Sequence, residues 1–429
     1  MFLRSAHLKN IRSLRDVSLP FVRNGDAARR WTLVLGENGS GKSTILRAIA
    51  LALAGSEALP ELLGDVDGWI ANGEKKASIE LGIATAEGEP RSIRLVLERG
   101  LGRTAVVKRN HANLDALDRA LSYTQRSYLV AGYGVSRRLR SGTSPSPQEA
   151  PGSPRTRAVA SLFHAEAELQ SLETWAMDLE YRRGEKGLAL VRDAVGGILP
   201  GIEFAKVDRE KRQLLFSTRD GMVPLARLSD GYQHVAAWMG DLLFRITETF
   251  DDYKNPLAAR GLLLIDELEL HLHPLAQRRL RAFLDLKLPN LQIVATTHSA
   301  LTAQQAGEGD LFYLRRDGRR EEPVLHAFRG DPQKLFAHQL LLSDAFGVTT
   351  LHSPAVQEQR DRYLALRDKA RRSPAEVREF AALTDALRAL PDWSAGASTA
   401  RVPVDVAQPA PRAATRKART AKTEKRRRT

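Results

Sequence analysis

A glycine-rich segment near the N-terminus holds the residue types best suited to chemistry. Residues 36–43 read Gly-Glu-Asn-Gly-Ser-Gly-Lys-Ser, which matches the phosphate-loop pattern G-x-x-x-x-G-K-[ST]. Its glycines let the backbone curl around phosphate oxygens, with amide groups pointing at the anion from the positive end of a helix. Lys42 is expected to neutralise the β- and γ-phosphates, and Ser43 to coordinate Mg²⁺. The predicted nucleotide-binding residues are Gly36, Asn38, Gly39, Ser40, Gly41, Lys42, Ser43 and Thr44.

Two carboxylates follow an apolar run much later in the chain. Residues 262–265 are all Leu or Ile and lead into Asp266 and Glu267, a pattern typical of a central parallel strand with acids at its C-terminal edge. Asp266 is placed to hold Mg²⁺, and Glu267 is placed to orient and polarise an attacking water. A pair of edge carboxylates can also be solvated bystanders, but the phosphate loop favours the catalytic interpretation.

A histidine follows a second apolar strand. Residues 291–295 lead through two threonines to His298. A lone histidine is usually a packed or surface residue. Its position after the paired carboxylates favours a catalytic role instead, in which His298 donates a hydrogen bond to the γ-phosphate and senses its presence.

A serine and a glycine begin an apolar helical pattern. Residues 228–231 read Leu-Ser-Asp-Gly, so Ser229 stands where a helix N-cap belongs. Because helix N-termini bind anions, Ser229 and Gly231 can contact a phosphate. Ordinary helix capping is the alternative interpretation.

The elements that must position these residues are predicted from hydrophobic periodicity. An apolar run at 31–35 precedes the phosphate loop, and helical spacing follows it. Three β-rich stretches, at 77–83, 92–98 and 104–108, predict an antiparallel layer beside the nucleotide core. The expected fold class is α/β, a P-loop NTPase head with a mixed β layer plus a parallel-sheet core.

Composition changes suggest how the chain is divided. We expect the N-terminal half of the head at 1–140, a flexible Ser/Pro/Gly-rich loop at 141–158, an inserted helical and β segment at 159–227, the C-terminal half of the head at 228–330, a C-terminal helical segment at 331–392 and a disordered basic tail at 393–429.

Composition also excludes several classes of protein. The 429 residues are 43% hydrophobic, enough for a substantial core, and contain no cysteine, which removes disulfides and thiol chemistry. There is no apolar run long enough to span a membrane and no signal-peptide pattern. We therefore expect a cytoplasmic protein without a membrane partner.

The positive charge is concentrated at the C-terminus. Residues 401–429 hold ten Lys or Arg and two acidic residues, a net charge of +8, which leaves +6 of the total of +14 for residues 1–400. Such a tail can hold nucleic-acid phosphates with little sequence preference. A solvated terminal extension is the alternative.

The order of the four motifs resembles that of the ABC ATPases. In that family two ATP molecules are sandwiched in a head-to-head dimer, and the serine motif of one protomer completes the phosphate site of the other. The resemblance implies ATP and Mg²⁺ as cofactors, Ser229 and Gly231 as a contact in trans, and a homodimer or higher homo-oligomer. It also implies an ABC-type head with an inserted helical lid and C-terminal helices.

Further segments narrow the resemblance. Residues 8–14 (Leu-Lys-Asn-Ile-Arg-Ser-Leu) and 36–39 resemble SMC and RecF-like heads, and no heptad pattern for a long coiled coil is present. Residues 266–274, Gln277 and the Thr-His-Ser at 297–299 resemble stand-alone ATPases of antiphage systems, the Septu-type and retron-associated ATPases, which work beside a separate nuclease.

The resemblance implies a sensor or regulatory ATPase that controls a nuclease effector. OLD proteins of the same AAA group carry their own Toprim nuclease, but no Asp-x-Asp pair for its metal site follows His298. A RecF-like repair ATPase acting directly on DNA is the alternative. A transporter subunit is disfavoured by the length, the tail and the N-terminal motif.

Some residues depart from the family pattern or stay open. Asp230 and Tyr232 replace residues of the usual Leu-Ser-Gly-Gly-Gln, and Ala300 stands where many relatives have proline. No glutamine follows the third core strand, where Gly132-Tyr133-Gly134 and Arg137 stand instead.

Two clusters allow two interpretations each. His271 and His273 beside Glu269 suggest either a metal site or, by resemblance, a loop at the dimer interface. Arg137, Arg138 and Arg140 suggest either a nucleic-acid or phosphate contact or a solvated run.

Overall fold

The computed structural model describes residues 2–23, 27–85, 88–122, 129–139, 152–195, 202–219, 221–250, 256–316, 322–388 and 390. The chain divides into two compact units, Met1–Leu351 and His352–Thr429. The predicted tail, the Arg140 position and most of the predicted loop at 141–158 lie outside the described residues.

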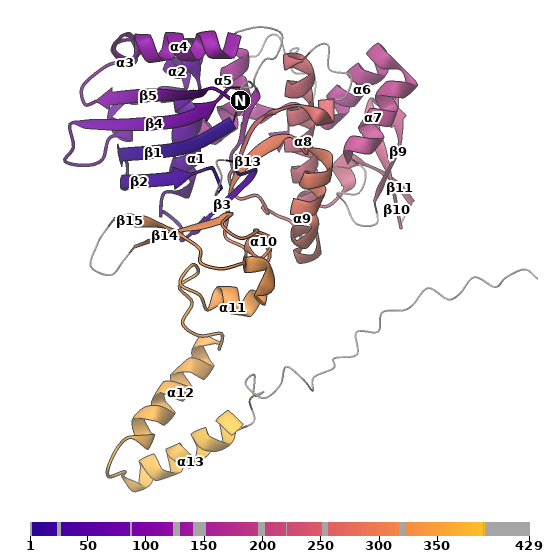
Figure 1. Ribbon diagram of the computed structural model, residues 1–429. Helices are drawn as coiled ribbons and strands as arrows, with labels where there is room; N and C mark the ends of the chain where they lie inside the picture. Colours follow the sequence, from indigo (N-terminus) through magenta and orange to yellow (C-terminus); the bar gives the residue numbers. More distant parts are fainter. Residues whose placement is uncertain are drawn as a thin grey trace, which may run out of the picture. The chain divides into compact units, whose positions relative to one another are not determined.

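A six-stranded, mostly parallel sheet forms the centre of the first unit (Figure 1). Its strands are β3 (Trp31–Gly36), β6 (Leu129–Tyr133), β12 (Gly261–Ile265), β13 (Leu291–Thr297), β14 (Leu311–Arg316) and β15 (Pro323–Ala327). Their order is β15-β14-β3-β13-β12-β6, and β15 alone pairs antiparallel, with β14. Strands β3, β12 and β13 are buried along their whole length, which explains their predominantly apolar sequences. The predicted parallel-sheet core is confirmed.

A four-stranded antiparallel sheet lies on one side of this core. It consists of β2 (Leu14–Pro20), β1 (Phe2–Ile11), β4 (Lys76–Ala84) and β5 (Pro90–Glu98), in that order. Helix α1 (Lys42–Ala52) contacts both sheets, and its Leu46 and Ile49 are fully buried in the shared core. The indigo and violet strands of this layer are visible beside α1 in Figure 1. The predicted antiparallel layer is therefore present.

One buried amide side chain joins the two sheets. Gln292 of β13 is 1% exposed. Its Oε1 accepts a hydrogen bond from the Leu3 amide at 2.7 Å, and its Nε2 donates to the Leu3 carbonyl at 2.9 Å and to the Arg29 carbonyl at 2.9 Å. A side-chain amide presents the same donor and acceptor as a peptide group, so Gln292 acts as a neighbouring strand residue for β1.

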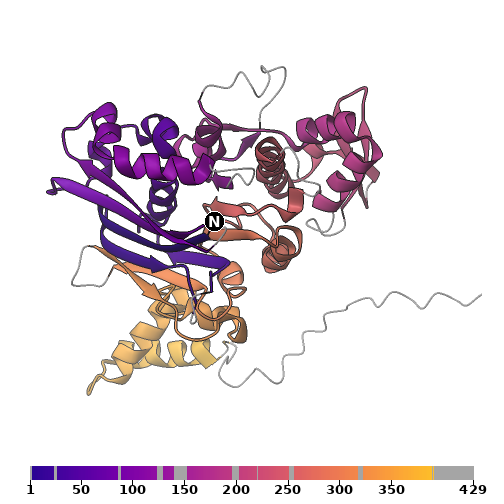
Figure 2. The same ribbon diagram turned by 45° about the horizontal axis from the view of Figure 1, so that its top comes forward.

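Helices cover the other face of the parallel sheet. They are α6 (Leu172–Arg183), α7 (Glu185–Val195), α8 (Asp230–Thr249) and α9 (Pro274–Lys287). Alternate residues of β12 separate the two cores: Leu263 and Ile265 face α8, and Leu262 and Leu264 face α1. A small sheet of β9 (Glu203–Asp208), β10 (Gln213–Thr218) and β11 (Gly221–Pro224) accompanies α6 and α7, drawn in magenta in Figures 1 and 2.

Short elements complete the first unit. They are α2 (Gly55–Leu63), η1 (Asp67–Trp69), α3 (Arg103–Arg109), α4 (His111–Ser122), β7 (Arg138–Leu139), α5 (Pro154–Phe163), β8 (Glu168–Leu169), η3 (Leu225–Arg227), η4 (Pro256–Ala258), α10 (Ala300–Ala303), η5 (Pro332–Lys334) and α11 (Ala337–Leu341).

The second unit contains a pair of helices, α12 (Pro354–Arg367) and α13 (Pro374–Arg388). Between them Tyr363 stacks on Phe380, and Arg362 pairs with Glu379 at 2.7 Å.

Two expectations about local structure are wrong. The β-rich stretch at 104–108 lies in helix α3, because Val106 is buried against neighbouring elements and tertiary packing overrides the strand propensity of its β-branched residues. The predicted loop at 141–158 extends too far, since Pro154 begins helix α5. The Ser153 hydroxyl caps that helix by accepting from the Thr156 amide, and a Ser-Pro pair at a helix start was a readable signal.

Within the described part of the chain, no helix combines the length and apolar character that crossing a membrane requires.

Replacing Gln292 with leucine tests the joint between the sheets. Gln292→Leu keeps an apolar side chain in the core but leaves buried backbone groups of Leu3 and Arg29 without partners, so we expect the free energy of unfolding to fall by about 2–4 kcal/mol. Urea denaturation would measure the loss. Thr32→Val is the matched control in β3, because the buried Thr32 hydroxyl has no partner among the described residues. An equal loss in both variants would contradict the prediction.

Candidate functional site

The predicted site residues gather where four neighbouring parallel strands end. In the order of the sheet, β3 leads into the phosphate loop, β13 into His298, β12 into Asp266 and Glu267, and β6 into the segment that contains Arg137. Register pairs Leu35 with Thr297, and Ile265 with both Ala295 and Tyr133. The carboxyl ends of these strands therefore meet along one edge, where open α/β sheets bind ligands.

The phosphate loop is already curled in the structure. Gly41 is the N-cap of α1, with φ of 102° in the left-handed region, so the loop delivers its amides to the helix N-terminus. The Lys42 ammonium donates to the carbonyls of Gly36 and Glu37, both at 2.8 Å. The hydroxyl of Ser40 is buried and lacks a hydrogen-bond partner among the residues described. Lysine and hydroxyl donors thus line a loop shaped for an anion.

The charge of Lys42 is balanced by the acids of the same edge. Burial lowers the pKa of Lys42, and Asp266, Glu267 and Glu269 act in the opposite direction. The lysine therefore lies within electrostatic reach of the carboxylates that follow β12, as the sequence predicted.

Thr296 at the end of β13 contacts both Asp266 and Glu267. The Thr296 hydroxyl donates to Asp266 Oδ1 at 2.6 Å and accepts from the Glu267 amide at 2.8 Å. Asp266 is 3% exposed, whereas the Glu267 side chain is one-third exposed. One carboxylate is thus fixed at the strand edge, and the other is partly exposed.

His298 lies beside Glu267. Its Nε2 is 3.9 Å from Glu267 Oε1. The backbone around it is held by Glu269, whose Oε1 accepts from the amides of His298 at 2.8 Å and Ser299 at 3.1 Å. The structure thus brings the histidine and the carboxylate together from different strands.

The serine segment begins α8 and packs against the turn after Glu267. Ser229 is exposed at the N-cap, and within the described residues its side chain makes no capping hydrogen bond. Gly231 approaches the turn closely, since a Cβ there would lie 2.4 Å from the His271 carbonyl oxygen. The rings of His234 and His271 stack at 4.4 Å. Ordinary side-chain capping by Ser229 is not what the structure shows.

Comparison with known proteins finds two domain models that match the chain. Residues 5–132 match a protein-family model described as "AAA domain", and residues 129–303 match one described as "AAA domain, putative AbiEii toxin, Type IV TA system". Together the two matches include all four strand ends described above. Residues 5–303 thus carry an AAA-type ATPase domain.

Relatives of this ATPase include Septu and retron proteins. It is 25% identical to "Septu protein PtuA" of Bacillus mycoides (strain KBAB4) over 391 residues, which cover 90% of this chain and 50% of that protein. It is 29% identical to "Retron Ec83 probable ATPase" of Escherichia coli over 143 residues, 33% of this chain and 26% of that protein. The matched regions thus span about half or less of these relatives' own length.

Among solved structures, the ATPase is similar to an SmcHead bound to the C-winged helix domain of ScpA. The alignment covers 77% of this chain and 98% of that chain, at 14% identity and a TM-score of 0.46.

The ATPase has a buried arginine at the site that the sequence left without a role. Arg137 follows β6 and is 3% exposed. Its Nη2 donates to the carbonyls of Asp266 at 2.7 Å and Glu267 at 2.8 Å, and its Nε donates to the Gly134 carbonyl at 3.2 Å. Arg137 is therefore neither part of a solvated run nor an exposed nucleic-acid contact. The Arg138 side chain lies outside the described residues.

The donor set fits Mg²⁺. Ser43 and Asp266 offer a hydroxyl and a carboxylate oxygen, and Mg²⁺ characteristically takes one or two protein oxygens beside substrate phosphates. No cluster of three or more His, Cys, Asp or Glu suited to a metal ion occurs among the described residues. His271 and His273, considered above as a possible metal site, have local contacts instead. His273 Nδ1 accepts from the Leu275 amide at the start of α9, and His271 stacks on His234.

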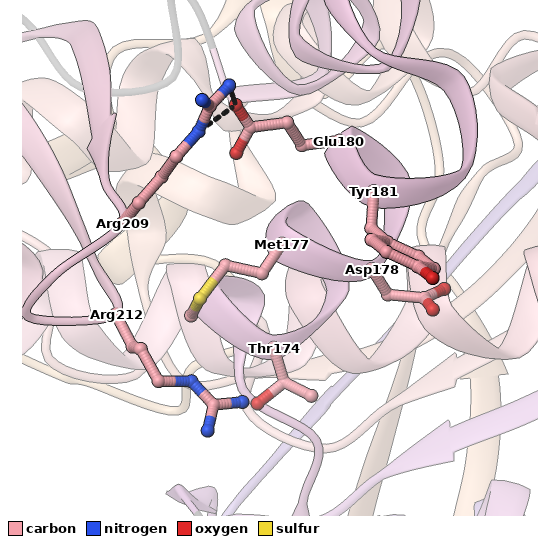
Figure 3. A pocket seen from close by; sticks show the side chains of 7 residues that line it. All are labelled: Thr174, Met177, Asp178, Glu180, Tyr181, Arg209 and Arg212. Carbon is pink, nitrogen blue, oxygen red and sulfur yellow. Dashed lines mark hydrogen bonds and ion pairs between the residues drawn. The ribbon is translucent and has the colours of Figure 1, made fainter.

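A hollow in the surface lies away from the residues that were predicted from the sequence. It has a volume of about 650 Å³ and opens between α6 and the turn from β9 to β10 (Figure 3). Its lining residues are Thr174, Met177, Asp178, Glu180, Tyr181, Arg209 and Arg212. Arg209 is paired with Glu180 at 2.6 Å across it. No residue predicted from the sequence contributes to this hollow.

Thr296 was not assigned a role from the sequence, and Glu269 was considered only beside His271 and His273. The contacts of both residues become visible only where strands that are distant in the sequence lie side by side. An acid or threonine at a strand end carries no such pairing information on its own.

Removing the Thr296 hydroxyl should impair the turn that carries Asp266 and Glu267. Thr296→Val keeps the shape but leaves the Glu267 amide and Asp266 Oδ1 without this partner, so we expect about 1–3 kcal/mol less stability and a kcat for ATP hydrolysis lowered at least about tenfold. Thr302→Val is the control, because the buried Thr302 hydroxyl has no partner in the described part of the chain. Steady-state hydrolysis and urea denaturation would check both, and a normal kcat for Thr296→Val would refute the role of Thr296.

Proposed function

We propose that this protein binds and hydrolyses ATP with Mg²⁺, dimerises head to head on ATP, and regulates a partner nuclease in an antiphage defence system. The observation that carries the hydrolytic part is the meeting of Lys42, Asp266, Glu267 and His298 at one sheet edge, with 3.9 Å between His298 Nε2 and Glu267 Oε1. The relation to Septu and retron ATPases supports the defence setting.

The residues divide the chemistry of phosphoryl transfer. Lys42 and the loop amides would hold the β- and γ-phosphates, and Ser43 and Asp266 would hold Mg²⁺, which would neutralise charge on the phosphates. Glu267 orients a water whose oxygen forms a bond to the γ-phosphorus while the bond from that phosphorus to the β,γ-bridging oxygen breaks. The water proton is taken up by the Glu267 carboxylate or by phosphate. His298 donates to the γ-phosphate and senses its departure.

The serine segment supports the dimer. Ser229 is exposed at the N-terminus of a 20-residue helix, with its side chain not used for capping in the described structure. A free hydroxyl beside helix amides is suited to a phosphate supplied by another protomer. We propose that Ser229 and Gly231 complete the partner's site in trans, despite the Asp230 and Tyr232 substitutions.

We further propose that the ATPase senses an infection signal and releases or activates a separate nuclease. The basic residues after 400 would add nucleic-acid affinity through phosphate contacts. The protein would act in the cytoplasm, where the effector and its target nucleic acid are found.

Mixing two inactive variants tests the trans arrangement. Lys42→Ala disables the phosphate loop and Ser229→Arg disables the contact in trans, so each homodimer should be inactive. A mixed dimer retains one site with both groups intact, so an equimolar mixture should recover about a quarter of the wild-type hydrolysis rate. Absence of recovery, with both variants folded by circular dichroism, would exclude the composite site.

A trapped complex tests the partner. Glu267→Gln should bind ATP but hydrolyse it at least about a hundredfold more slowly, holding the ATP-bound state. Tagged wild-type, Glu267→Gln and Lys42→Ala proteins would be purified from the native host and assayed by mass spectrometry and for nuclease activity. A stoichiometric nuclease enriched with Glu267→Gln supports the proposal. Recovery of DNA without a protein partner would favour the repair ATPase.

A further inference from the structure

A buried arginine from another segment contacts the backbone that carries Glu267. Arg137 lies in the segment after β6, and its hydrogen bonds in the described structure go to the backbone carbonyls of Gly134, Asp266 and Glu267. The planar guanidinium carries five N–H donors in a fixed fork, whereas a lysine ammonium has three donors on a single nitrogen, so a lysine at this position would not reproduce the same geometry. The guanidinium thus connects the end of β6 to the end of β12.

One of these carbonyls belongs to a residue with an unusual backbone. Glu267 has φ of 49°, in the left-handed region that a residue with a Cβ rarely adopts. Such a conformation is strained and persists where its surroundings hold it. Here the Glu267 amide donates to Thr296 Oγ1, and the Glu267 carbonyl accepts from Arg137 Nη2, both at 2.8 Å. The two contacts hold the peptide groups on both sides of the Cα that carries the carboxylate.

Burying the Arg137 guanidinium costs desolvation free energy, and local packing alone does not explain why the group is buried here. Burial lowers the pKa of Arg137 to about 10, against the opposing effect of Asp266 and the two nearby glutamates, so the group is still charged at neutral pH. Its Nη1 is buried and has no hydrogen-bond partner among the described residues. Natural proteins seldom leave such a donor unmet unless the site has a function.

We propose that Arg137 is a positioning residue for hydrolysis: by fixing the left-handed backbone of Glu267 it sets the direction of the carboxylate that orients the attacking water. This inference rests on the hydrolytic role proposed for Glu267. Arg137 occupies the place after the third core strand where the resemblance leads one to expect a glutamine. Because it acts on the backbone, its loss lowers kcat while ATP binding by the phosphate loop continues.

The matched control is a second buried arginine of the same unit. Arg29 is 7% exposed and donates to two backbone carbonyls, those of Pro20 and Val22. Its Nε is buried, makes no hydrogen bond in the described structure and lies 3.9 Å from Asp310 Oδ1. Among the described residues, Arg29 makes no hydrogen bond or ion pair with Asp266 or Glu267, so Arg29→Ala reproduces the loss of a buried guanidinium without the proposed effect on Glu267.

The experiment compares full-length wild type, Arg137→Lys, Arg137→Ala and Arg29→Ala. Steady-state Mg-ATP hydrolysis gives kcat and KM, calorimetric titration gives ATP affinity, and thermal unfolding gives the folded fraction. We expect kcat to fall about a hundredfold in both Arg137 variants, with ATP affinity within about threefold of wild type. Added guanidinium ion at millimolar concentration should raise the kcat of Arg137→Ala several-fold and leave Arg29→Ala unchanged.

Each contrary outcome has a definite meaning. Unchanged kcat in the folded Arg137 variants, equal losses of kcat and ATP affinity, or no guanidinium rescue would overturn the positioning role. Loss of the unfolding transition in both Arg137 variants but not in Arg29→Ala would also overturn it, by making the guanidinium a requirement of folding. If wild type itself shows no hydrolysis that Lys42→Ala abolishes, the proposed function fails instead.

Discussion

Hydrogen bonding between parallel strands is the constraint on which this structure depends. Strands β6, β12, β13 and β3 lie side by side and point the same way, so their C-terminal ends must reach one edge together. Groups separated by more than two hundred residues in the chain, such as Lys42 and Glu267, are brought into electrostatic reach of one another by this pairing alone. The loop after each of these strands then needs only to direct one or two side chains toward the site.

The sequence was sufficient for the parts of the site whose chemistry is local. A phosphate loop carries its own strand, turn and helix signals, and the apolar run before Asp266 and the mostly apolar run before Thr296 are what doubly covered strands require. The helix at 103–109 was mistaken for a strand because Val106 and its neighbours favour extended structure in isolation, and only contacts with other elements make it helical. Arg137 had no assignable role because its partners are backbone carbonyls, which leave no trace in sequence.

The turns at the strand ends are held mainly by side chains that bind main-chain groups of a neighbouring turn. Thr296 binds the Glu267 amide, Glu269 binds the amides of His298 and Ser299, and Arg137 binds the carbonyls of Asp266 and Glu267. Charged groups make such contacts stronger than neutral ones. Neither Glu267 nor His298 is therefore positioned by its own loop alone. The geometry of the site depends on contacts between neighbouring loops along this edge of the sheet.

Gln292 has a mechanical consequence for the molecule. Because its amide pairs with Leu3 as a strand neighbour would, the central strand β13 and the antiparallel layer share a hydrogen-bonded joint inside the core. Sliding one sheet over the other would break these hydrogen bonds, which are buried in the core. The hydrogen bonds of Gln292 therefore couple the two sheets, so a displacement of β13, the strand that leads into His298, would strain the bonds that hold β1.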